Sequence, residues 1–178
     1  MAVLGVPLST GVLALTACAS GQGPTVPSPD VARSITVTSP DFGSGQPLPA
    51  RLTCRGAGTP PTLAWTGLPA RTRSVAVVVS DPDAPHGPYV HWVVYDLPAA
   101  DGRLEDGAAP PGARVAPNSA GHRAWAPPCP PTGTHHYRFT VYAVDDHITV
   151  GTTDQVFAAI GEGALARGTL TGTVAASP

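Results

Sequence analysis

The sequence predicts a mostly β domain with one helix near its C-terminal end. Short runs of alternating or continuously apolar residues recur along the chain, and only one stretch shows helical spacing. Glycine and proline contribute 20 and 22 of the 178 residues, which indicates many turns between short elements. The length suits one domain with a substantial core and is short for two.

Several strands are expected along the chain. Residues 34–38 alternate between polar and apolar side chains, which is typical of a strand with one buried face. The valine-rich run at 74–80 predicts a central strand covered on both faces, and residues 137–144 alternate cleanly. In chain order, the expected strands are 34–38, 48–53, 63–65, 74–80, 90–97, 137–144 and 170–174.

One helix is expected between the last two strands. Thr153 or Asp154 would cap it, and Gly168 would end it. Its apolar stripe is uneven and consists of Val156, Phe157, Ile160 and Leu165. Residues 101–121 form a long polar segment without a period, which predicts a functional loop or a surface excursion.

The first 33 residues are expected to lie outside the domain. Residues 3–17 are apolar and small, and the LTAC sequence that ends at Cys18 follows the pattern of a bacterial lipoprotein signal. A peptidase would cut before Cys18, whose thiol would carry a diacylglycerol. The usual basic residue is missing, so an ordinary secretory signal or a disordered N-terminus remains an alternative. We expect a signal at 1–17, a Pro/Ser/Gly tether at 18–33 and a domain at 34–178 of an exported, membrane-anchored protein.

Composition excludes some partners. The net charge is −2 and no basic cluster occurs, which argues against a nucleic-acid partner. The sequence contains no GxGxxG, P-loop or HExxH motif, so no cofactor is expected.

Two aspartates follow the valine-rich strand in the sequence SDPDAP, residues 80–85. Pro82 and Pro85 flank Asp83 and restrict the backbone, so the carboxylates of Asp81 and Asp83 would be held in place. A rigid turn after a buried strand explains the same residues equally well.

Histidines near these aspartates are candidate site residues. If residues 81–88 connect adjacent strands, His91 lies close to the carboxylates, and a carboxylate bound to its ring would fix its tautomer and raise its pKa. The alternative is a strand histidine with a satisfied hydrogen bond. Further on, His135 and Tyr137 share one strand face and His136 points the other way.

The sequence PPCPPTG at 127–133 predicts a rigid apolar wall. Its prolines have no N–H group, so this loop cannot pair as a central strand.

These motifs together resemble the phosphatidylethanolamine-binding protein family, in its bacterial Raf-kinase-inhibitor-like branch. The residues that carry the resemblance are DPDAP at 81–85 with His91-Trp92 behind it, and PCPPTGTHHYRFTVYAVD at 128–145. The sequences TSPDF, TPPTLAW and ALARGTLTG add support, and the resemblance covers residues 35–174.

The resemblance implies a central antiparallel sheet packed with a smaller sheet, a helix near the C-terminus and a small anion pocket. It implies a non-enzymatic protein that binds phosphate-like or carboxylate anions, including phospholipid headgroups, without a metal. Its ligand-binding residues would be Asp81, Asp83, His91, Cys129, Pro130, His135 and Tyr137. Because carboxylates repel anions, the aspartates would orient and charge His91 or receive an ethanolamine ammonium.

The resemblance also implies a disulfide between Cys54 and Cys129, with two buried free thiols as the alternative. Two residues depart from the family: Pro127 replaces a common glycine, and Trp125 replaces a common tyrosine. Both departures are expected to affect ligand preference.

Two other functions are compatible with the residues. A kinase or protease inhibitor would use a protein partner, and residues 101–121 are the candidate contact. A hydrolase would use His91, His135 and Asp81 with Ser80 as its nucleophile, although no G-x-S-x-G elbow is present.

Overall fold

The computed structural model describes residue 1, residues 24–105, residue 107 and residues 109–177. The expected signal at 1–17, Cys18 and the start of the tether lie outside these residues. Within the described part of the chain, no helix is both long enough and apolar enough to cross a bilayer.

The larger of two sheets has six strands in the order β1-β9-β8-β4-β5-β7. All neighbours in it run antiparallel except β1 and β9, which run parallel. Its strands are β1 (Arg33–Ser34), β4 (Ser74–Asp81), β5 (Tyr89–Leu97), β7 (Arg114–Val115), β8 (Thr134–Val144) and β9 (Ala164–Ala175). The long central strands β4, β5, β8 and β9 form its rigid middle.

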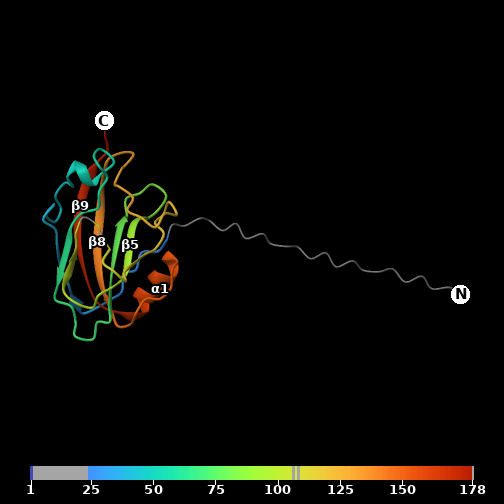
Figure 1. Cartoon of the computed structure of the whole chain (residues 1–178). Helices are drawn as coiled ribbons and strands as arrows, with labels where there is room; N and C mark the ends of the chain where they lie inside the picture. The colour runs from blue at the N-terminus through green and yellow to red at the C-terminus, as the bar shows by residue number, and fades with distance from the viewer. Residues whose placement is uncertain (2–23, 106, 108, 178) are drawn as a thin grey trace.

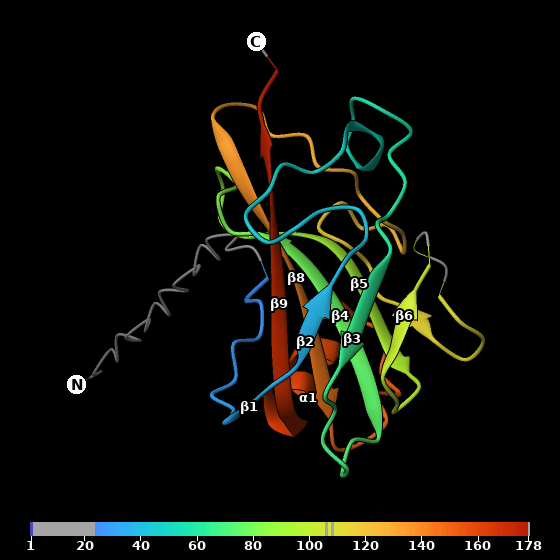
Figure 2. The same ribbon diagram turned by 90° about the vertical axis from the view of Figure 1, so that its left-hand side faces the viewer.

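A smaller antiparallel sheet covers one face of the large sheet. It contains β2 (Thr36–Thr38), β3 (Leu63–Thr66) and β6 (Gly102–Leu104) in the order β2-β3-β6. Figure 2 shows this small sheet in front of the large one, with α1 (Thr153–Gly163) behind it, and Figure 1 shows α1 on the side away from β9. The expected architecture of two sheets and one late helix is confirmed.

Each face of the large sheet has its own hydrophobic core, because β4 alternates between them. Val75, Val77 and Val79 pack with residues of the small sheet, such as Leu63 and Trp65. Ala76 and Val78 pack on the opposite face with Val156 and Ile160 of α1. The prediction that residues 74–80 form a strand covered on both faces is therefore confirmed.

The N-terminal strands differ from expectation in two places. Residues 34–38 are divided between β1 and β2, which belong to different sheets, with buried Ile35 at the crossing. Residues 48–53 are not a strand, because Ala50–Leu52 form the single 3₁₀ turn η1. Pro47 and Pro49 lack the N–H groups that a strand would need, and the Leu52 amide instead donates to the Pro49 carbonyl at 2.9 Å.

The helix is shorter than the sequence predicts. Its N-cap is Thr152, which forms a capping box with Gln155, and α1 ends at Gly163 rather than Gly168. The final strand is correspondingly longer and begins at Ala164. The long β8 accounts for this, because β9 pairs with it along its whole length, from Thr134 opposite Ala175 to Val144 opposite Ala164.

Residues 101–121 contain more structure than expected, because both β6 and β7 form within them. Leu104 is fully buried and anchors β6 beside Leu63 of β3, while Val115 of β7 pairs with Val94 of β5. These pairings tie both ends of the segment to the two sheets.

Candidate functional site

A cavity of about 290 Å³ lies where β4, β5 and β8 meet the proline loop, and we call it the histidine pocket. It is lined by Asp81, Ala84, Pro85, Tyr89, His91, Ala126, Pro127, Cys129, Pro130, Pro131, His135 and Tyr137. Every residue expected from the sequence lies on this lining except Asp83.

Strand alternation places the pocket side chains of β8. His135 and Tyr137 face the pocket and are only 6% and 1% exposed, whereas His136 between them faces outward. The prediction that His135 and Tyr137 share one face of the strand and that His136 points the other way is therefore confirmed.

Asp81 binds His135, not His91. The Asp81 Oδ2 atom lies 2.7 Å from His135 Nδ1, and both side chains are buried. Asp81 Oδ1 accepts a 2.8 Å hydrogen bond from the Asp83 amide. The same carboxylate therefore positions a pocket histidine and closes the turn that follows β4, so the two interpretations of SDPDAP are compatible.

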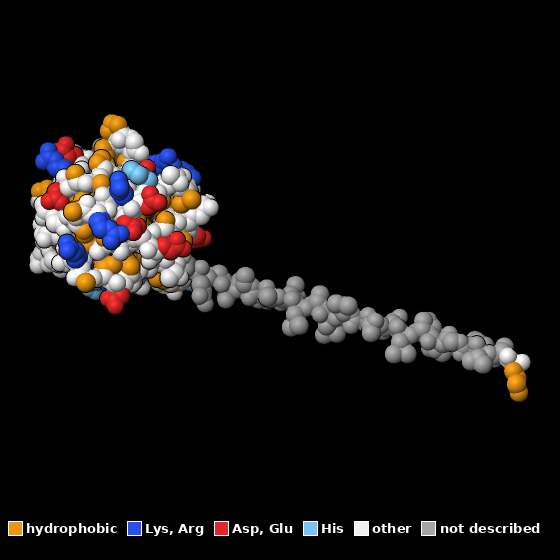
Figure 3. Space-filling model, turned by 90° about the horizontal axis from the view of Figure 1, so that it is seen from below, with side chains coloured by type: hydrophobic (Ala, Val, Ile, Leu, Met, Phe, Trp, Pro, Cys, Tyr) orange, Lys and Arg blue, Asp and Glu red, His pale blue; other side chains and the backbone are white. Residues whose placement is uncertain are grey.

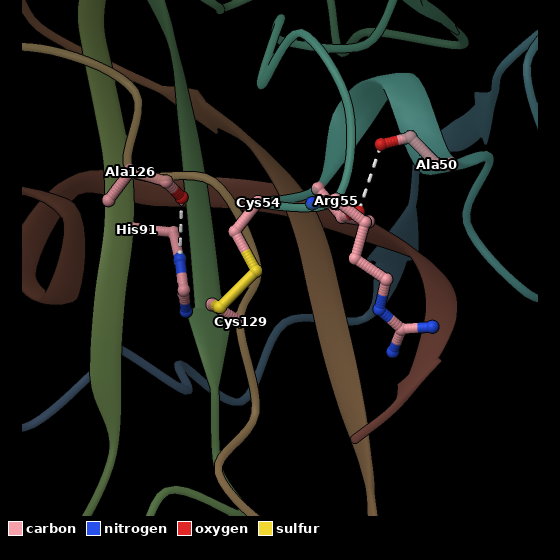
Figure 4. Close-up of a disulfide and its surroundings, with 7 residues drawn as sticks. Ala50, Cys54, Arg55, His91, Ala126 and Cys129 are labelled. Carbon is pink, nitrogen blue, oxygen red and sulfur yellow. Dashed lines mark hydrogen bonds between the residues drawn. A yellow bond between two sulfur atoms is a disulfide. The ribbon is translucent and has the colours of Figure 1, made fainter. Parts of the chain in front are cut away.

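His91 has a backbone partner in place of a carboxylate. Its Nδ1 atom lies 2.7 Å from the Ala126 carbonyl oxygen, which only accepts, so Nδ1 carries a proton. Figure 4 shows this bond and shows the second ring nitrogen directed away from Ala126. Burial lowers the pKa of His91 and outweighs the opposing effects of the Ala126 carbonyl and Asp81. Asp81 thus acts in the expected direction, but burial decides the net shift of the His91 pKa.

Asp83 lies beside the pocket and binds β8 on its outward face. Its Oδ2 atom accepts 2.8 Å hydrogen bonds from both the backbone amide and the Nδ1 of His136. These hydrogen bonds lower the pKa of Asp83. The structure thus gives Asp83 a partner other than the expected His91, on the outward face of β8.

Aromatic rings form much of the pocket. The ring of His91 lies between those of Tyr89 and Tyr137, with centroid distances of 4.8 and 5.1 Å. Burial, and then the neighbouring Asp81 carboxylate, raise the pKa of Tyr137, so its hydroxyl stays protonated and can donate. Tyr89 was not expected from the sequence, although its period-two spacing from His91 is a signal that could have found it.

The proline loop is fastened to the rest of the domain on two sides. The Ala126 amide donates to the His91 carbonyl at 2.9 Å, and the Cys54 amide donates to the Pro128 carbonyl at 3.0 Å. Cys54 and Cys129 form a disulfide with a Cα–Cα distance of 5.4 Å, which Figure 4 shows. Together these links hold one wall of the histidine pocket in place.

The two residues that we expect to depart from the family, Pro127 and Trp125, lie at this wall. Pro127 lines the pocket directly. Trp125 packs against Trp92, His91 and Phe139, and its Nε1 atom is buried without a hydrogen-bond partner among the described residues.

The lining can donate to an anion but offers no nucleophile at the expected position. Tyr137 supplies an O–H group in a wall that is otherwise largely apolar. His91 and His135, whose Nδ1 atoms already bind Ala126 and Asp81, each offer a second N–H to the pocket when the ring is cationic. Ser80 does not line the histidine pocket and instead faces a separate cavity on the other side of the sheet. Among the residues that the structure describes, no three His, Cys, Asp or Glu side chains are grouped so as to hold a metal ion.

A sequence model of the family described as phosphatidylethanolamine-binding protein matches residues 38–175. The chain belongs to this family. The histidine pocket lies within the matched residues.

Similar proteins extend the comparison. "Putative lipoprotein LppC" of Mycobacterium tuberculosis is 40% identical over 158 residues, covering 76% of this chain and 78% of that protein. A Mycobacterium tuberculosis protein named UPF0098 protein Rv1910c is 46% identical over 133 residues, covering 73% of this chain and 63% of its own length. The crystal structure of Escherichia coli YbcL, described as a new member of the mammalian family, has a TM-score of 0.75 at 31% identity and covers 81% of this chain and 99% of that one.

Proposed function

We propose that the histidine pocket binds a small anion, either a phosphate-like group or a carboxylate, and that phospholipid headgroups are among its ligands. The observation that carries this proposal is the convergence of His91, His135 and the protonated Tyr137 on one cavity of about 290 Å³. Such a cavity suits a headgroup-sized ligand.

The arrangement of charged groups in the pocket favours donation of hydrogen bonds from the histidines to an anion. Among the described residues on the lining, Asp81 is the one that carries a carboxylate, and its Oδ2 atom is occupied by His135. This hydrogen bond orients the imidazole, so the ligand would meet the ring rather than the carboxylate. An anion beside His91 would favour its protonated form, so binding should tighten as the pH falls and weaken as it rises.

The protein acts as a binder rather than an enzyme under this proposal. A hydrolase would need a nucleophile beside its base, and Ser80 faces away from the histidine pocket. The hydroxyl groups of the described lining belong to Tyr89 and Tyr137. The raised pKa of Tyr137 makes it a poor nucleophile and a good donor.

We further propose that the domain is exported and held at a membrane by a diacylglycerol on Cys18. The LTAC sequence before the tether supports this, as does the name of the similar mycobacterial protein, which calls it a lipoprotein. A lipid on Cys18, close in sequence to the domain, would keep the pocket near the membrane surface.

Isothermal titration with phosphate, phosphoethanolamine and acetate tests the pocket. We expect saturable binding that His135→Gln and Tyr137→Phe each weaken, because the first removes a ring that can become cationic and the second removes a hydroxyl donor. His147→Gln is the matched control, since His147 pairs with Asp96 on the exposed surface outside the pocket. Equal affinities for all three variants and the parent chain would reject the histidine pocket as the binding site.

A further inference from the structure

A second cavity, of about 490 Å³, lies on the opposite face of the large sheet, and we call it the arginine cavity. Arg138 and Thr140 of β8, Arg167 and Thr169 of β9, and Ser80 of β4 form its floor, and His86 of the β4–β5 turn lies at its side. Residues 24–28 also line it. The cavity and the histidine pocket therefore lie on opposite sides of the same turn.

The lining of the arginine cavity carries positive charge without acidic residues. It includes two arginines, a histidine and several hydroxyl groups, but no Asp or Glu among the described residues that line it. This contrasts with the whole chain, whose net charge is −2. On the face seen in Figure 3, basic and acidic side chains lie interspersed. The arginine cavity therefore differs from that face, because its described lining contains basic side chains without acidic ones.

Neither arginine has a carboxylate partner in the described part of the chain. Arg51, Arg71 and Arg103 all form ion pairs elsewhere. Arg167 donates to the neutral Ser28 hydroxyl at 2.7 Å, and no described residue accepts a hydrogen bond from the side chain of Arg138. Two guanidinium groups thus face one cavity with donor capacity to spare.

The two arginines extend from backbone positions toward different ends of the floor. Arg167 pairs with Tyr142, four residues along β8 from Arg138, so the two backbone positions are separated by about 13 Å. A ligand that contacts both arginines along the floor can therefore be longer than a bare anion. A phosphate ester fits this arrangement, with its phosphate accepting from one guanidinium group and its remaining oxygens accepting from the other.

Residues 24–28 line the arginine cavity, so the cavity lies close to the N-terminal end of the domain. The Tyr142 hydroxyl donates to the Pro27 carbonyl at 2.6 Å, and Val26 packs on the core beneath α1. Pro24 follows Cys18 by six residues (24 minus 18), which span at most about 22 Å when fully extended. If Cys18 carries a lipid, as proposed above, the cavity must lie close to the headgroup layer.

We infer that the arginine cavity is a second anion site, distinct from the histidine pocket, that binds a phosphate ester through Arg138 and Arg167. The ester can come from an anionic phospholipid of the anchoring membrane or from a soluble molecule. Anionic lipid surfaces attract arginines that lie within a Debye length, which favours the membrane as its source.

The test uses the whole chain carrying Cys18→Ser, so that no acyl group is attached. Glycerol 3-phosphate is the soluble probe, read through the side-chain Nε resonances of the arginines. Vesicles of phosphatidylcholine, with or without phosphatidylglycerol, are the membrane probe. We expect Arg138→Gln and Arg167→Gln each to weaken binding at least about tenfold, because each removes a charge-assisted hydrogen bond.

Two control variants test whether binding depends on the arginine cavity itself. Arg71→Gln removes the same charge from an exposed side chain paired with Asp145, outside the cavity lining, and should leave binding unchanged. In His135→Gln, glycerol 3-phosphate should still shift the arginine Nε resonances, and this local signal separates the arginine cavity from the histidine pocket. Arginine-dependent binding to vesicles alone would identify the ester as lipid, and binding to glycerol 3-phosphate would show that acyl chains are unnecessary.

Three results would overturn the inference. The first is no saturable binding to either probe. The second is an equal loss with Arg71→Gln, which would indicate attraction by net charge alone. The third is binding that His135→Gln abolishes and Arg138→Gln leaves intact, which would assign the ester to the histidine pocket.

Discussion

His135 Nδ1 lies 2.7 Å from Asp81 Oδ2, and this buried pair joins the end of β4 to the beginning of β8. The two strands are neighbours in the large sheet. The pair therefore contributes to the sheet and to the pocket at once, and its replacement should affect both.

Replacement of Asp81 by Asn should destabilise the domain by about 1–2 kcal/mol, because a charge-assisted hydrogen bond in a buried site becomes a neutral one. Asp83→Asn is the matched control. Its partner His136 is exposed, and such surface pairs contribute about 0–1 kcal/mol. Urea unfolding of both variants measures the difference, and equal losses would show that burial of the Asp81 pair has no energetic consequence.

The lowered pKa of His91 makes stability depend on pH in a defined direction. The unfolded chain binds a proton at His91 near the ordinary pKa of 6.5, whereas the folded chain binds it only at lower pH. The contribution of His91 is therefore complete above pH 6.5 and is lost as the pH falls toward the folded-state pKa.

A His91→Gln variant should show a smaller loss of stability than the parent chain over this acidic range. Chemical unfolding at a series of pH values provides the comparison. If the parent and variant lost stability in parallel, protonation of His91 would not contribute to the acid sensitivity.

The Cys54–Cys129 disulfide closes a loop with a sequence separation of 75. Loop-closure entropy predicts a stabilisation of about 4 kcal/mol, as an order of magnitude. Both cysteines are exposed, so a mild reductant should reach them and replacement by serine should leave no buried void. Unfolding with and without reductant measures the loss, and the Cys54→Ser/Cys129→Ser double variant should be insensitive to reductant.

Gly168 should not tolerate a side chain. A Cβ atom there would lie 1.9 Å from the Ile35 carbonyl oxygen, where the chain crosses between the two sheets. We expect Gly168→Ala to destabilise the domain by about 1–3 kcal/mol through overpacking. Gly161→Ala in α1 is the control, because its Cβ would meet no atom within 4 Å and should stabilise the helix by about 0.5–1 kcal/mol. An unchanged free energy of unfolding in Gly168→Ala would contradict the close contact between Gly168 and the Ile35 carbonyl.

Gly168 also shows what the sequence predicts well and where it fails. The strands with strong apolar periodicity, β4, β5 and β8, were predicted because each carries its own pattern. The end of α1 was not, because Gly168 resembles a helix terminator locally and serves instead to let β9 pass Ile35 closely. That contact lies about 130 positions away in sequence (168 minus 35 is 133) and leaves no local signal.

In the candidate site, too, local patterns could be predicted from the sequence and long-range contacts could not. The pocket faces of His135 and Tyr137 follow from period two, so they could be predicted from the sequence. The partner of Asp81 could not, because His91 is nearer along the chain, while β8 pairs with β4 over a longer separation and brings His135 to the carboxylate. Choosing between two histidines requires the strand order, which the residue types alone do not contain.

The most direct test of the central claim is a histidine NMR titration of the whole Cys18→Ser chain with phosphoethanolamine. The account predicts that the imidazole signals of His91 and His135 shift together, saturate with one dissociation constant and move less at higher pH. The exposed His147 should not move, because it lies outside the pocket and pairs with Asp96. If His91 and His135 stayed unshifted at saturating ligand, or moved no more than His147, the histidine pocket would not be an anion site.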